Sequence, residues 1–313
     1  MSRPVLGEVR AVIDVGSNSV LTLVAAWDGD AWRTVHESSC VTGLGEGTKT
    51  TGLLSDAAMT RTLAAVEKGF ADARRLGAAR VEAWATMAAR IASNTGDFLR
   101  LASAQGTPIG VLSGEREAEL GFLAVANDPA FRDAERLTII DVGGHSTELV
   151  AAHRSSGGWA LDVHKSYPIG TLALRSGVLC NPSPGPAERM RAVSDMDEAI
   201  GLAFLPGKCG TTVALGATGT NLITIRERMT SWEPSLVHGR YLLYEEVGRS
   251  AGWLLDLNDE ERAAIVGIEP GRERSLHIGV LILERFLYAA RSERCWVSTR
   301  GWRHALLETS VGL

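Results

Sequence analysis

Short apolar runs interrupted by glycine and serine recur along the chain. Residues 11–26 read AVIDVGSNSVLTLVAA, a pattern that predicts two strands joined by a turn of small residues. Residues 138–152 read TIIDVGGHSTELVAA and predict the same arrangement. Alignment of the two runs pairs identical residues, which are Asp14 with Asp141, Gly16 with Gly143, and Ser19 with Ser146. The chain therefore repeats a strand-turn-strand unit.

The spacing of the two runs indicates duplicated domains. Asp141 follows Asp14 by 127 residues, which is the length of a domain rather than of a solenoid repeat. We expect two similar domains, 1–128 and 129–313, facing each other across a cleft, with a helix at about 302–313 as an element that could pack on the first. Chance similarity of two Gly-Ser turns is the alternative, and recurrence of three residue types in register disfavours it.

The rest of the first half alternates strands with helices, which is typical of α/β domains. Asp28-Gly29-Asp30 is a turn signal and predicts a third antiparallel strand at 31–39. The later elements are expected in this order: a loop at 43–47, a helix at 55–76 capped by Ser55, a strand at 80–85, a helical turn from 86, a helix at 97–104, a strand at 108–112, and a helix at 114–126 capped by Ser113.

The second half continues with both element types after its hairpin. The expected elements are a strand at 161–165, a short helix after Gly170, a loop at 181–186, a helix to about 203, a strand at 212–215, helices at 245–255, 259–266 and 272–288, a strand at 295–298, and a helix from 302. Between the strand at 212–215 and the helix that follows it, Gly216-Ala217-Thr218-Gly219-Thr220-Asn221 places backbone donors where an anion could bind.

The hairpin turns carry candidate chemistry. Backbone N–H groups of a small-residue turn, together with the Ser146 and Thr147 hydroxyls, can hold a phosphate. Asp141 and Glu148 flank that turn and are the hard oxygen ligands that a magnesium ion prefers.

Composition narrows the function classes. The chain has 313 residues, 45% of them apolar and 22% charged, which is ordinary for a soluble protein with two full cores. The formal net charge of −5 argues against a general nucleic-acid binder. A polyanionic ligand must therefore be bound by a local cluster of positive groups.

Cysteine usage and the first residues favour the cytoplasm. The four cysteines have no zinc-type spacing and suit a reducing compartment; they are Cys40, Cys180, Cys209 and Cys295. The first ten residues lack the apolar core of a signal peptide, and no apolar run approaches the ~18 residues of a membrane helix. We expect no nucleic-acid or membrane partner, and a homodimer stays an option.

Seven ordered motifs span nearly the whole chain. They are IDVGSNS, ATMAARIASN, VLSGEREAE, IIDVGGHSTELV, ALGATGTN, PGRER and VSTRGWRHALL. In this order they resemble the exopolyphosphatase and guanosine pentaphosphate phosphatase family. The resemblance implies the duplicated fold of actin, sugar kinases and Hsp70, which is ribonuclease H-like, and it agrees with the repeat.

The resemblance also implies an activity and a set of site residues. The activity is hydrolysis of a terminal phosphoryl group from polyphosphate or guanosine pentaphosphate, usually with Mg²⁺ and with Mn²⁺ as an alternative. Glu117 resembles the general base, and Asp14, Asp141 and Glu148 resemble metal-binding carboxylates. The implied phosphate-binding residues are Gly16, Ser17, Asn18, Ser19, Arg90, Gly143, Gly144, His145, Ser146, Thr147, Gly219 and Arg274.

The glutamates of the SGEREAE motif differ in their expected surroundings. At 100° per residue, Glu117 lies about 20° from Ala124 and about 40° from Gly121, on a side of small residues that another backbone can approach. Glu115 and Glu119 lie elsewhere, where acids at a helix start favour the dipole. Taken alone, Arg90 and Arg274 would be interpreted as surface arginines, and the motif match favours phosphate binding.

Several positions depart from the family pattern. His145 replaces a third glycine, and Asn18 stands at the same place in the first turn; both residue types tolerate positive φ. The His145 imidazole either lies over the phosphate or points into solvent. The basic residue expected after the first turn is absent from Val20-Leu21-Thr22, Gly43 replaces an arginine, and His277 replaces an aspartate.

Three functions stay open at this point. The first is a magnesium-dependent phosphohydrolase acting on an alarmone or on polyphosphate, with short chains favoured because no further helical domain follows. The second is a kinase of the sugar or acetate type, disfavoured by Glu117 and by the lack of a sugar-binding motif. The third is a silent sensor that binds a phosphorylated nucleotide.

Overall fold

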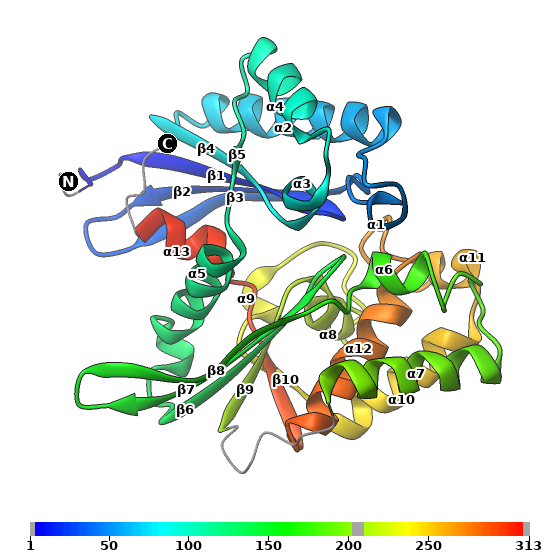
Figure 1. Ribbon diagram of the computed structural model, residues 1–313. Helices are drawn as coiled ribbons and strands as arrows, with labels where there is room; N and C mark the ends of the chain where they lie inside the picture. Colours follow the sequence, from blue (N-terminus) through cyan, green and yellow to red (C-terminus); the bar gives the residue numbers. More distant parts are fainter. Residues whose placement is uncertain (1–3, 202–209, 309–313) are drawn as a thin grey trace. The chain divides into compact units, whose positions relative to one another are not determined.

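The computed structural model describes residues 4–201 and 210–308 (Figure 1). The chain divides into two compact units: Met1–Leu123 together with Trp302–Leu313, and Ala124–Gly301. The division falls within α5 (Gly114–Ala126).

The first unit is built on a five-stranded sheet with the order β3-β2-β1-β4-β5. Its strands are β1 (Val9–Val15), β2 (Ser19–Trp27), β3 (Trp32–Val41), β4 (Arg80–Ala85) and β5 (Gly110–Val111). β1 pairs antiparallel with β2 and parallel with β4. The carboxyl end of β1 therefore leads directly into the turn at residues 16–18.

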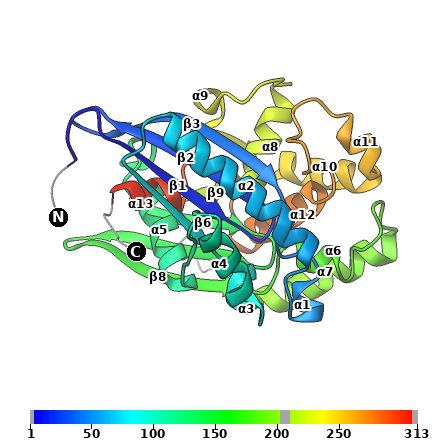
Figure 2. The same ribbon diagram turned by 90° about the horizontal axis from the view of Figure 1, so that it is seen from above.

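Helices cover both faces of this sheet. They are α1 (Thr48–Thr51), α2 (Asp56–Arg75), α3 (Met87–Ile91), α4 (Thr95–Ala104), the start of α5, and α13 (Trp302–Glu308). α2 contacts β1, β2 and β4, while α13 contacts β1 from the other face (Figures 1 and 2). Val66 and Phe70 of α2 are buried against Ile13 and Val15 of β1. The last helix of the chain is thus part of the first unit.

The second unit repeats the strand order of the first. Its sheet has the order β10-β11-β9-β6-β7-β8. The strands are β6 (Arg136–Val142), β7 (Thr147–Ser155), β8 (Gly158–Tyr167), β9 (Thr211–Leu215), β10 (Arg240–Leu243) and β11 (Arg294–Val297). β6 pairs antiparallel with β7 and parallel with β9, as β1 does with β2 and β4. Among the strands of the described residues, the edge strand β10 is the one without a counterpart in the first sheet.

The core of the second unit is centred on α12 (Leu276–Ala289), which is apolar around most of its surface and buried along most of its length. It packs on β6 and is surrounded by α6, α7, α8 and α10. The other helices are η1 (Pro129–Phe131), α6 (Thr171–Arg175), α7 (Pro186–Ile200), α8 (Ala217–Arg226), α9 (Pro234–Val237), α10 (Tyr244–Asp256) and α11 (Asp259–Ala263).

Most expected elements are present, and the exceptions have physical causes. The sequence pattern missed α1, η1, α9 and β10, because each has only three or four residues. The helix expected from 272 begins at Leu276, since Gly271 has φ +89° and the residues before it, Gly267 and Glu269, are hydrogen-bonded to α8. The helix predicted to reach 203 ends at Ile200, and residues 202 and 203 lie outside the described part.

Cys40, Cys180 and Cys295 are free thiols, while Cys209 lies outside the described residues. Among the helices that the structure describes, none is long and apolar enough to cross a membrane.

Candidate functional site

The turn of the β1–β2 hairpin is closed by one hydrogen bond and fixed to α3. The Gly16 N–H donates to the Ser19 carbonyl at 2.9 Å. A Cβ on Gly16 would lie 3.0 Å from the same oxygen, so glycine suits this position. The Ser17 hydroxyl accepts a hydrogen bond of 3.1 Å from the Ala88 N–H of α3. The turn and the helix that carries Arg90 are therefore one connected structure.

The carbonyls of the first turn are directed toward the segment after β3. The Ser17 carbonyl accepts from the Gly45 N–H at 2.8 Å, and the Asn18 carbonyl accepts from the Thr42 N–H at 2.9 Å. In a trans peptide the N–H of the next residue points opposite to the carbonyl. The N–H groups of Asn18 and Ser19 therefore point away from that segment, as an anion-binding turn requires.

Polar atoms of the first hairpin are buried with unsatisfied hydrogen-bonding capacity. Within residues 4–201 and 210–308, the Asp14 Oδ1, Asn18 Nδ2 and Ser19 Oγ atoms are buried and make no hydrogen bond. Such groups are rare in native structures, and a bound ligand or ion is one reason for them. The first hairpin thus presents both an acceptor and donors that a hydrated phosphate or a cation could satisfy.

Asp14 lies in an environment that disfavours its charge. Burial raises the pKa of its carboxyl from 3.8 to about 6, although the positive charge of Arg303 and a hydrogen bond from Trp302 oppose the rise. Trp302 and Arg303 belong to α13, which packs on β1. Linear spacing gives no signal that joins this C-terminal helix to Asp14, because the residues lie far apart in the sequence.

Arg90 and Glu117, predicted for different roles, form an ion pair. Arg90 Nη1 lies 2.7 Å from Glu117 Oε2, and the two side chains are 20% and 22% exposed. The same nitrogen donates to the Leu112 carbonyl at 2.8 Å. Glu115 and Glu119 are exposed, as expected for acids at a helix start. Of these three glutamates, Glu117 is therefore the one that contacts Arg90, a candidate phosphate-binding residue.

The second hairpin turn repeats the closing bond of the first. The Gly143 N–H donates to the Ser146 carbonyl at 2.9 Å, and a Cβ on Gly143 would lie 2.9 Å from that oxygen. The Ser146 hydroxyl donates to Glu148 at 2.7 Å. Thr147 is fully buried, and its hydroxyl donates to the Ile169 carbonyl at 2.7 Å, so this hydroxyl proton is engaged within the unit.

The carbonyls of the second turn are capped by the first turn of α6. The Gly143 carbonyl accepts from the Thr171 N–H at 3.0 Å, and the Gly144 carbonyl accepts from the Leu172 N–H at 2.7 Å. The N–H groups of Gly144 and His145 consequently point away from α6. Gly170 makes this approach feasible, because a Cβ there would lie 2.5 Å from the Gly144 carbonyl carbon.

The structure excludes one of the two alternatives for His145, and it excludes a positive φ at both His145 and Asn18. The His145 side chain does not point into solvent, since the residue is 2% exposed. Neither residue has a positive φ; among the residues described, the non-glycine residues with positive φ are Arg228 and Arg291. The turns need glycine at positions 16 and 143 because of close contacts, so an extended or right-handed backbone suffices at the histidine and asparagine.

The second hairpin holds two carboxylates in register. Asp141 is the cross-strand partner of Glu148 in the antiparallel pair of β6 and β7. Glu148 Oε1 accepts hydrogen bonds from Ser146 at 2.7 Å and from Ser166 at 2.9 Å. No three His, Cys, Asp or Glu side chains gather into a complete metal site within the described chain. These two carboxylates fit a partial magnesium shell, which phosphate oxygens and water would complete.

Gly219 and Arg274 lie in different parts of the second unit. Gly219 is the third residue of α8, and a Cβ there would lie 3.3 Å from Ala214 and Val297. Close packing against the sheet thus explains why residue 219 is glycine. Its N–H lies in the first turn of the helix, where N–H groups have no acceptor within the helix. Arg274 is 54% exposed and lies 3.9 Å from Asp259.

His277, another departure from the family pattern, is a buried neutral residue. It is 1% exposed. Burial, together with the positive charges of Arg262 and Arg175, lowers its pKa to about 3. It therefore does not replace the charge of an aspartate at physiological pH.

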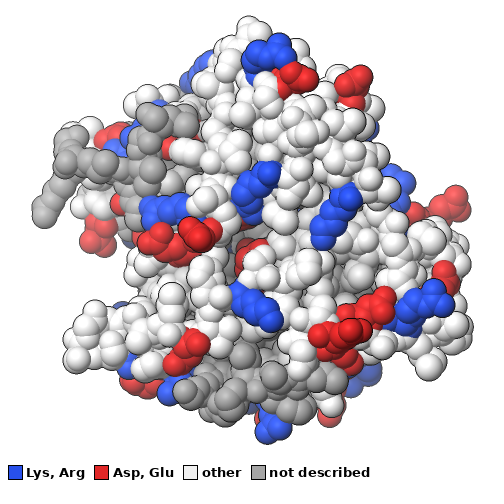
Figure 3. Space-filling model, viewed as in Figure 1, with Lys and Arg blue, Asp and Glu red and all other residues white. Residues whose placement is uncertain are grey.

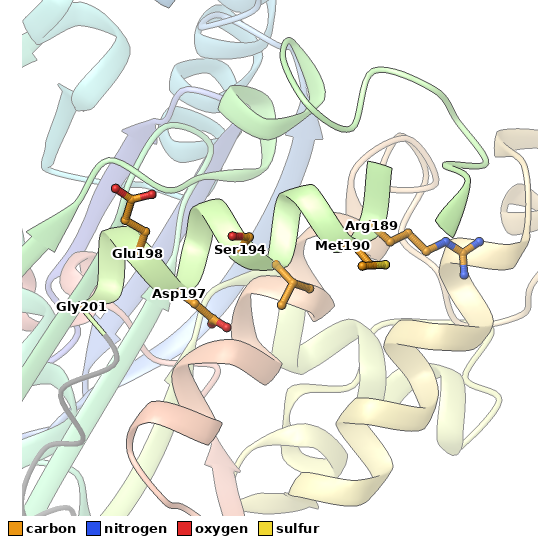
Figure 4. A pocket seen from close by; sticks show the side chains of 7 residues that line it. Arg189, Met190, Ser194, Asp197, Glu198 and Gly201 are labelled. Carbon is orange, nitrogen blue, oxygen red and sulfur yellow. The ribbon is translucent and has the colours of Figure 1, made fainter. Parts of the chain in front are cut away.

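One groove lies along α7, and charges of both signs lie on the face drawn in Figure 3. A groove of about 840 Å³ runs along α7 and is lined by Met190, Val193 and Asp197 among others (Figure 4). It contains none of the predicted site residues. On the face drawn in Figure 3, basic and acidic side chains are interspersed, in agreement with the small net charge.

The two units share one strand order and one closed glycine-serine turn, and these features define a protein of the duplicated actin-like fold. The family model described as "Ppx/GppA phosphatase family" matches residues 23–312. The chain belongs to this family, as the sequence motifs predicted.

Individual relatives agree with this assignment. Exopolyphosphatase 2 of Mycobacterium tuberculosis is 27% identical over 289 residues, covering 88% of each chain. The crystal structure of the Aquifex aeolicus family member is 26% identical, covers 97% of both chains, and has a TM-score of 0.78. An exopolyphosphatase structure from Cytophaga hutchinsonii, with 22% identity, 97% coverage of both chains and a TM-score of 0.86, supports the fold alone.

Proposed function

We propose that this phosphatase removes the terminal phosphate from short-chain polyphosphate or from guanosine pentaphosphate, with water as the acceptor. The observation that carries the proposal is the 2.7 Å contact between Arg90 and Glu117 beside a turn with unsatisfied buried polar atoms. This arrangement places a carboxylate that can accept a proton next to a guanidinium that can bind a phosphoryl oxygen.

The proposed reaction is a displacement at phosphorus. A water oxygen bonds to the terminal phosphorus, the bond from that phosphorus to the bridging oxygen breaks, and the shortened phosphate leaves with the electron pair. Glu117 takes the proton of the attacking water. Little covalent work is required of the protein, because orientation and charge neutralisation dominate phosphoryl transfer.

The ion pair itself suggests how the base becomes available. While Arg90 holds Glu117, the carboxylate electron pair is engaged in a charge-assisted hydrogen bond. A phosphoryl group that competes for the guanidinium would leave the Glu117 oxygen to orient the water. Arg90 in this account serves both the substrate and the base.

Magnesium, with manganese as an alternative, is proposed as the cofactor. When bound, the ion would neutralise charge on the phosphate oxygens. Asp141 and Glu148 of the second unit would hold it. Within the first unit, the buried Asp14 Oδ1 is a separate candidate ligand for a cation. The loop N–H groups would bind phosphate oxygens directly.

Release of phosphate from purified protein tests the proposal. The substrates are tripolyphosphate, long-chain polyphosphate, pyrophosphate and guanosine pentaphosphate, each with MgCl₂ or with a chelator. We expect magnesium-dependent release that is fastest with a short chain or with guanosine pentaphosphate. If none of these substrates releases phosphate, the hydrolase assignment is contradicted. A parallel assay with glucose or acetate as the acceptor then shows whether the protein transfers the phosphoryl group as a kinase.

A further inference from the structure

Arg262 of α11 is a fully buried arginine whose guanidinium has a partner for every N–H. The side chain is 0% exposed. Nε donates to the Glu273 carbonyl at 2.6 Å, Nη1 to the Leu254 and Leu257 carbonyls at 2.9 and 2.6 Å, and Nη2 to the Pro182 carbonyl and Asp259 at 3.0 and 2.5 Å. A buried charge is tolerated when it is satisfied in this way.

These bonds join segments that have little regular structure of their own. They connect the end of α10, the loop before α7, and the stretch that leads into Arg274. α11 has five residues, too few for a helix to be stable by its own hydrogen bonds. A lysine could not replace Arg262, because its ammonium is a point donor with three N–H groups rather than a planar fork.

Asp259 connects this buried arginine with Arg274. Its Oδ1 accepts from Arg262, while its Oδ2 lies 3.9 Å from Arg274 Nε. The exposed fractions rise along the series, from 0% for Arg262 to 30% for Asp259 and 54% for Arg274. The Asp259 carboxylate therefore lies between the buried guanidinium of Arg262 and the half-exposed guanidinium of Arg274, and the hydrogen bond from Arg262 fixes its position.

The segment before Arg274 is fastened at its other end to α8. The Glu269 N–H donates to Asn221 at 2.8 Å, and the Thr224 hydroxyl donates to the Gly267 carbonyl at 2.5 Å. Gly267 has φ +101°, and a Cβ there would lie 2.3 Å from the Thr224 carbonyl oxygen. The loop from 267 to 274 is consequently held at both ends.

We infer that Arg262, acting through Asp259, is a positioning residue that sets where the Arg274 guanidinium binds the phosphates of the substrate. The inference rests on the proposed function, in which Arg274 is a phosphate-binding residue. A role confined to stability predicts a different result, because it would lower the free energy of unfolding and leave KM unchanged in protein that is folded.

Asp259→Asn separates the two roles. The asparagine oxygen can still accept from Arg262, whereas its NH₂ group faces Arg274 and cannot pair with it. With tripolyphosphate and MgCl₂ at fixed ionic strength, we expect KM to rise about threefold to tenfold and kcat to change less than twofold. Glu245→Gln is the matched control, since it removes one carboxylate from an exposed pair with Arg249 at 3.8 Å; its KM should equal that of the wild type.

The double variant with Arg274→Ala completes the test. Arg274→Ala alone should raise KM, and adding either Asp259→Asn or Arg262→Lys should raise it no further. Independent increases in the double variants, or a wild-type KM for Asp259→Asn, would overturn the positioning role. A wild-type KM for Arg274→Ala would instead remove Arg274 from the proposed site and the inference with it. If the wild type releases no phosphate, the dissociation constant for tripolyphosphate, measured by calorimetry, replaces KM in every comparison.

Discussion

The two hairpins have the same backbone and different chemistry. In each, the glycine after the first strand donates to the carbonyl three residues later at 2.9 Å. Opposite Asp14 in the strand register is Leu21, whereas opposite Asp141 is Glu148. Duplication has therefore preserved the closed glycine-serine turn, while side chains at equivalent positions have diverged.

What surrounds each turn has diverged as well. The first turn is fixed by the Ser17 hydroxyl to α3, the helix that brings Arg90 to Glu117. The second is capped by α6, and its Ser146 hydroxyl binds a carboxylate of its own hairpin. Under the proposed function, the first unit would serve proton transfer through Glu117, and the second would supply the carboxylates Asp141 and Glu148 for a cation.

The largest effect is expected at the proposed base. Glu117→Gln keeps the size of the side chain and removes its basicity, so kcat should fall about 10²- to 10⁴-fold. Glu119→Gln is the matched control on the same helix, because Glu119 is 57% exposed and pairs with Arg116. Phosphate release at saturating tripolyphosphate measures both. Equal activities for the two variants would show that the first unit does not supply the base.

Asp14→Asn should reduce activity and stabilise the protein. With the folded pKa raised from 3.8 to about 6, the protonated carboxyl adds stability below pH 4, and this contribution is lost as pH rises through 6. At pH 7.5 the variant should therefore be more stable by up to about 3 kcal/mol, with no gain at pH 4. Urea unfolding at both pH values measures the difference.

A matched control for Asp14→Asn is Asp97→Asn, which neutralises a carboxyl that is 59% exposed. Its unfolding free energy should change by less than about 0.5 kcal/mol at pH 7.5. A destabilised Asp14→Asn protein at pH 7.5 would mean that the Trp302 bond and the Arg303 charge outweigh the burial of the carboxylate.

The fold and the turns could be predicted from sequence because their signals are local. Alternating apolar residues and the Gly-Ser pairs identify both hairpins, and Ser55 accepts the predicted cap bond from Ala58 at 3.3 Å. The supporting contacts could not be predicted in the same way. Trp302 donates a hydrogen bond to Asp14, and Arg262 donates one to the Pro182 carbonyl. Both contacts depend on tertiary structure, and no rule of sequence spacing connects the two residues of either pair.

One of the two alternatives for His145, exposure to solvent, is excluded for a related reason. A histidine in a glycine-rich turn suggests solvent exposure or positive φ, whereas the packing of Gly170 on the turn buries it. The absence of a Cβ at one position thus determines the surroundings of a residue 25 positions earlier.

Gly170→Ala should disturb the second hairpin and leave the first intact. The added Cβ would lie 2.5 Å from the Gly144 carbonyl group, so the turn or α6 must move. We expect a loss of about 1–3 kcal/mol in unfolding free energy and a higher KM for tripolyphosphate. Gly157→Ala is the control, since a Cβ there meets nothing within 4 Å. Similar stabilities for both variants would show that α6 does not constrain the turn.

The two turn serines should differ in their effect on stability, and Ser146→Ala should have the smallest effect. Ser17→Ala removes the acceptor for the Ala88 N–H, a buried contact between the first turn and α3, so it should lower the unfolding free energy by about 1–3 kcal/mol. Ser146→Ala removes a donor to Glu148, which keeps its bond from Ser166. Its stability should change by less than about 1.5 kcal/mol.

The kinetics of the same serine variants test whether the two turns differ in function. Ser146→Ala should raise the magnesium concentration needed for half-maximal activity, because Glu148 loses one of the bonds that orient its carboxylate, and Ser17→Ala should leave this concentration unchanged. The double variant tests whether both turns act on one substrate. If the two substitutions change kcat/KM independently, so that their fold-changes multiply, the two turns have separate roles. If the two single variants need the same magnesium concentration for half-maximal activity, the proposed separate roles of the two units are contradicted. The two turns would then be chemically equivalent despite their different carboxylates.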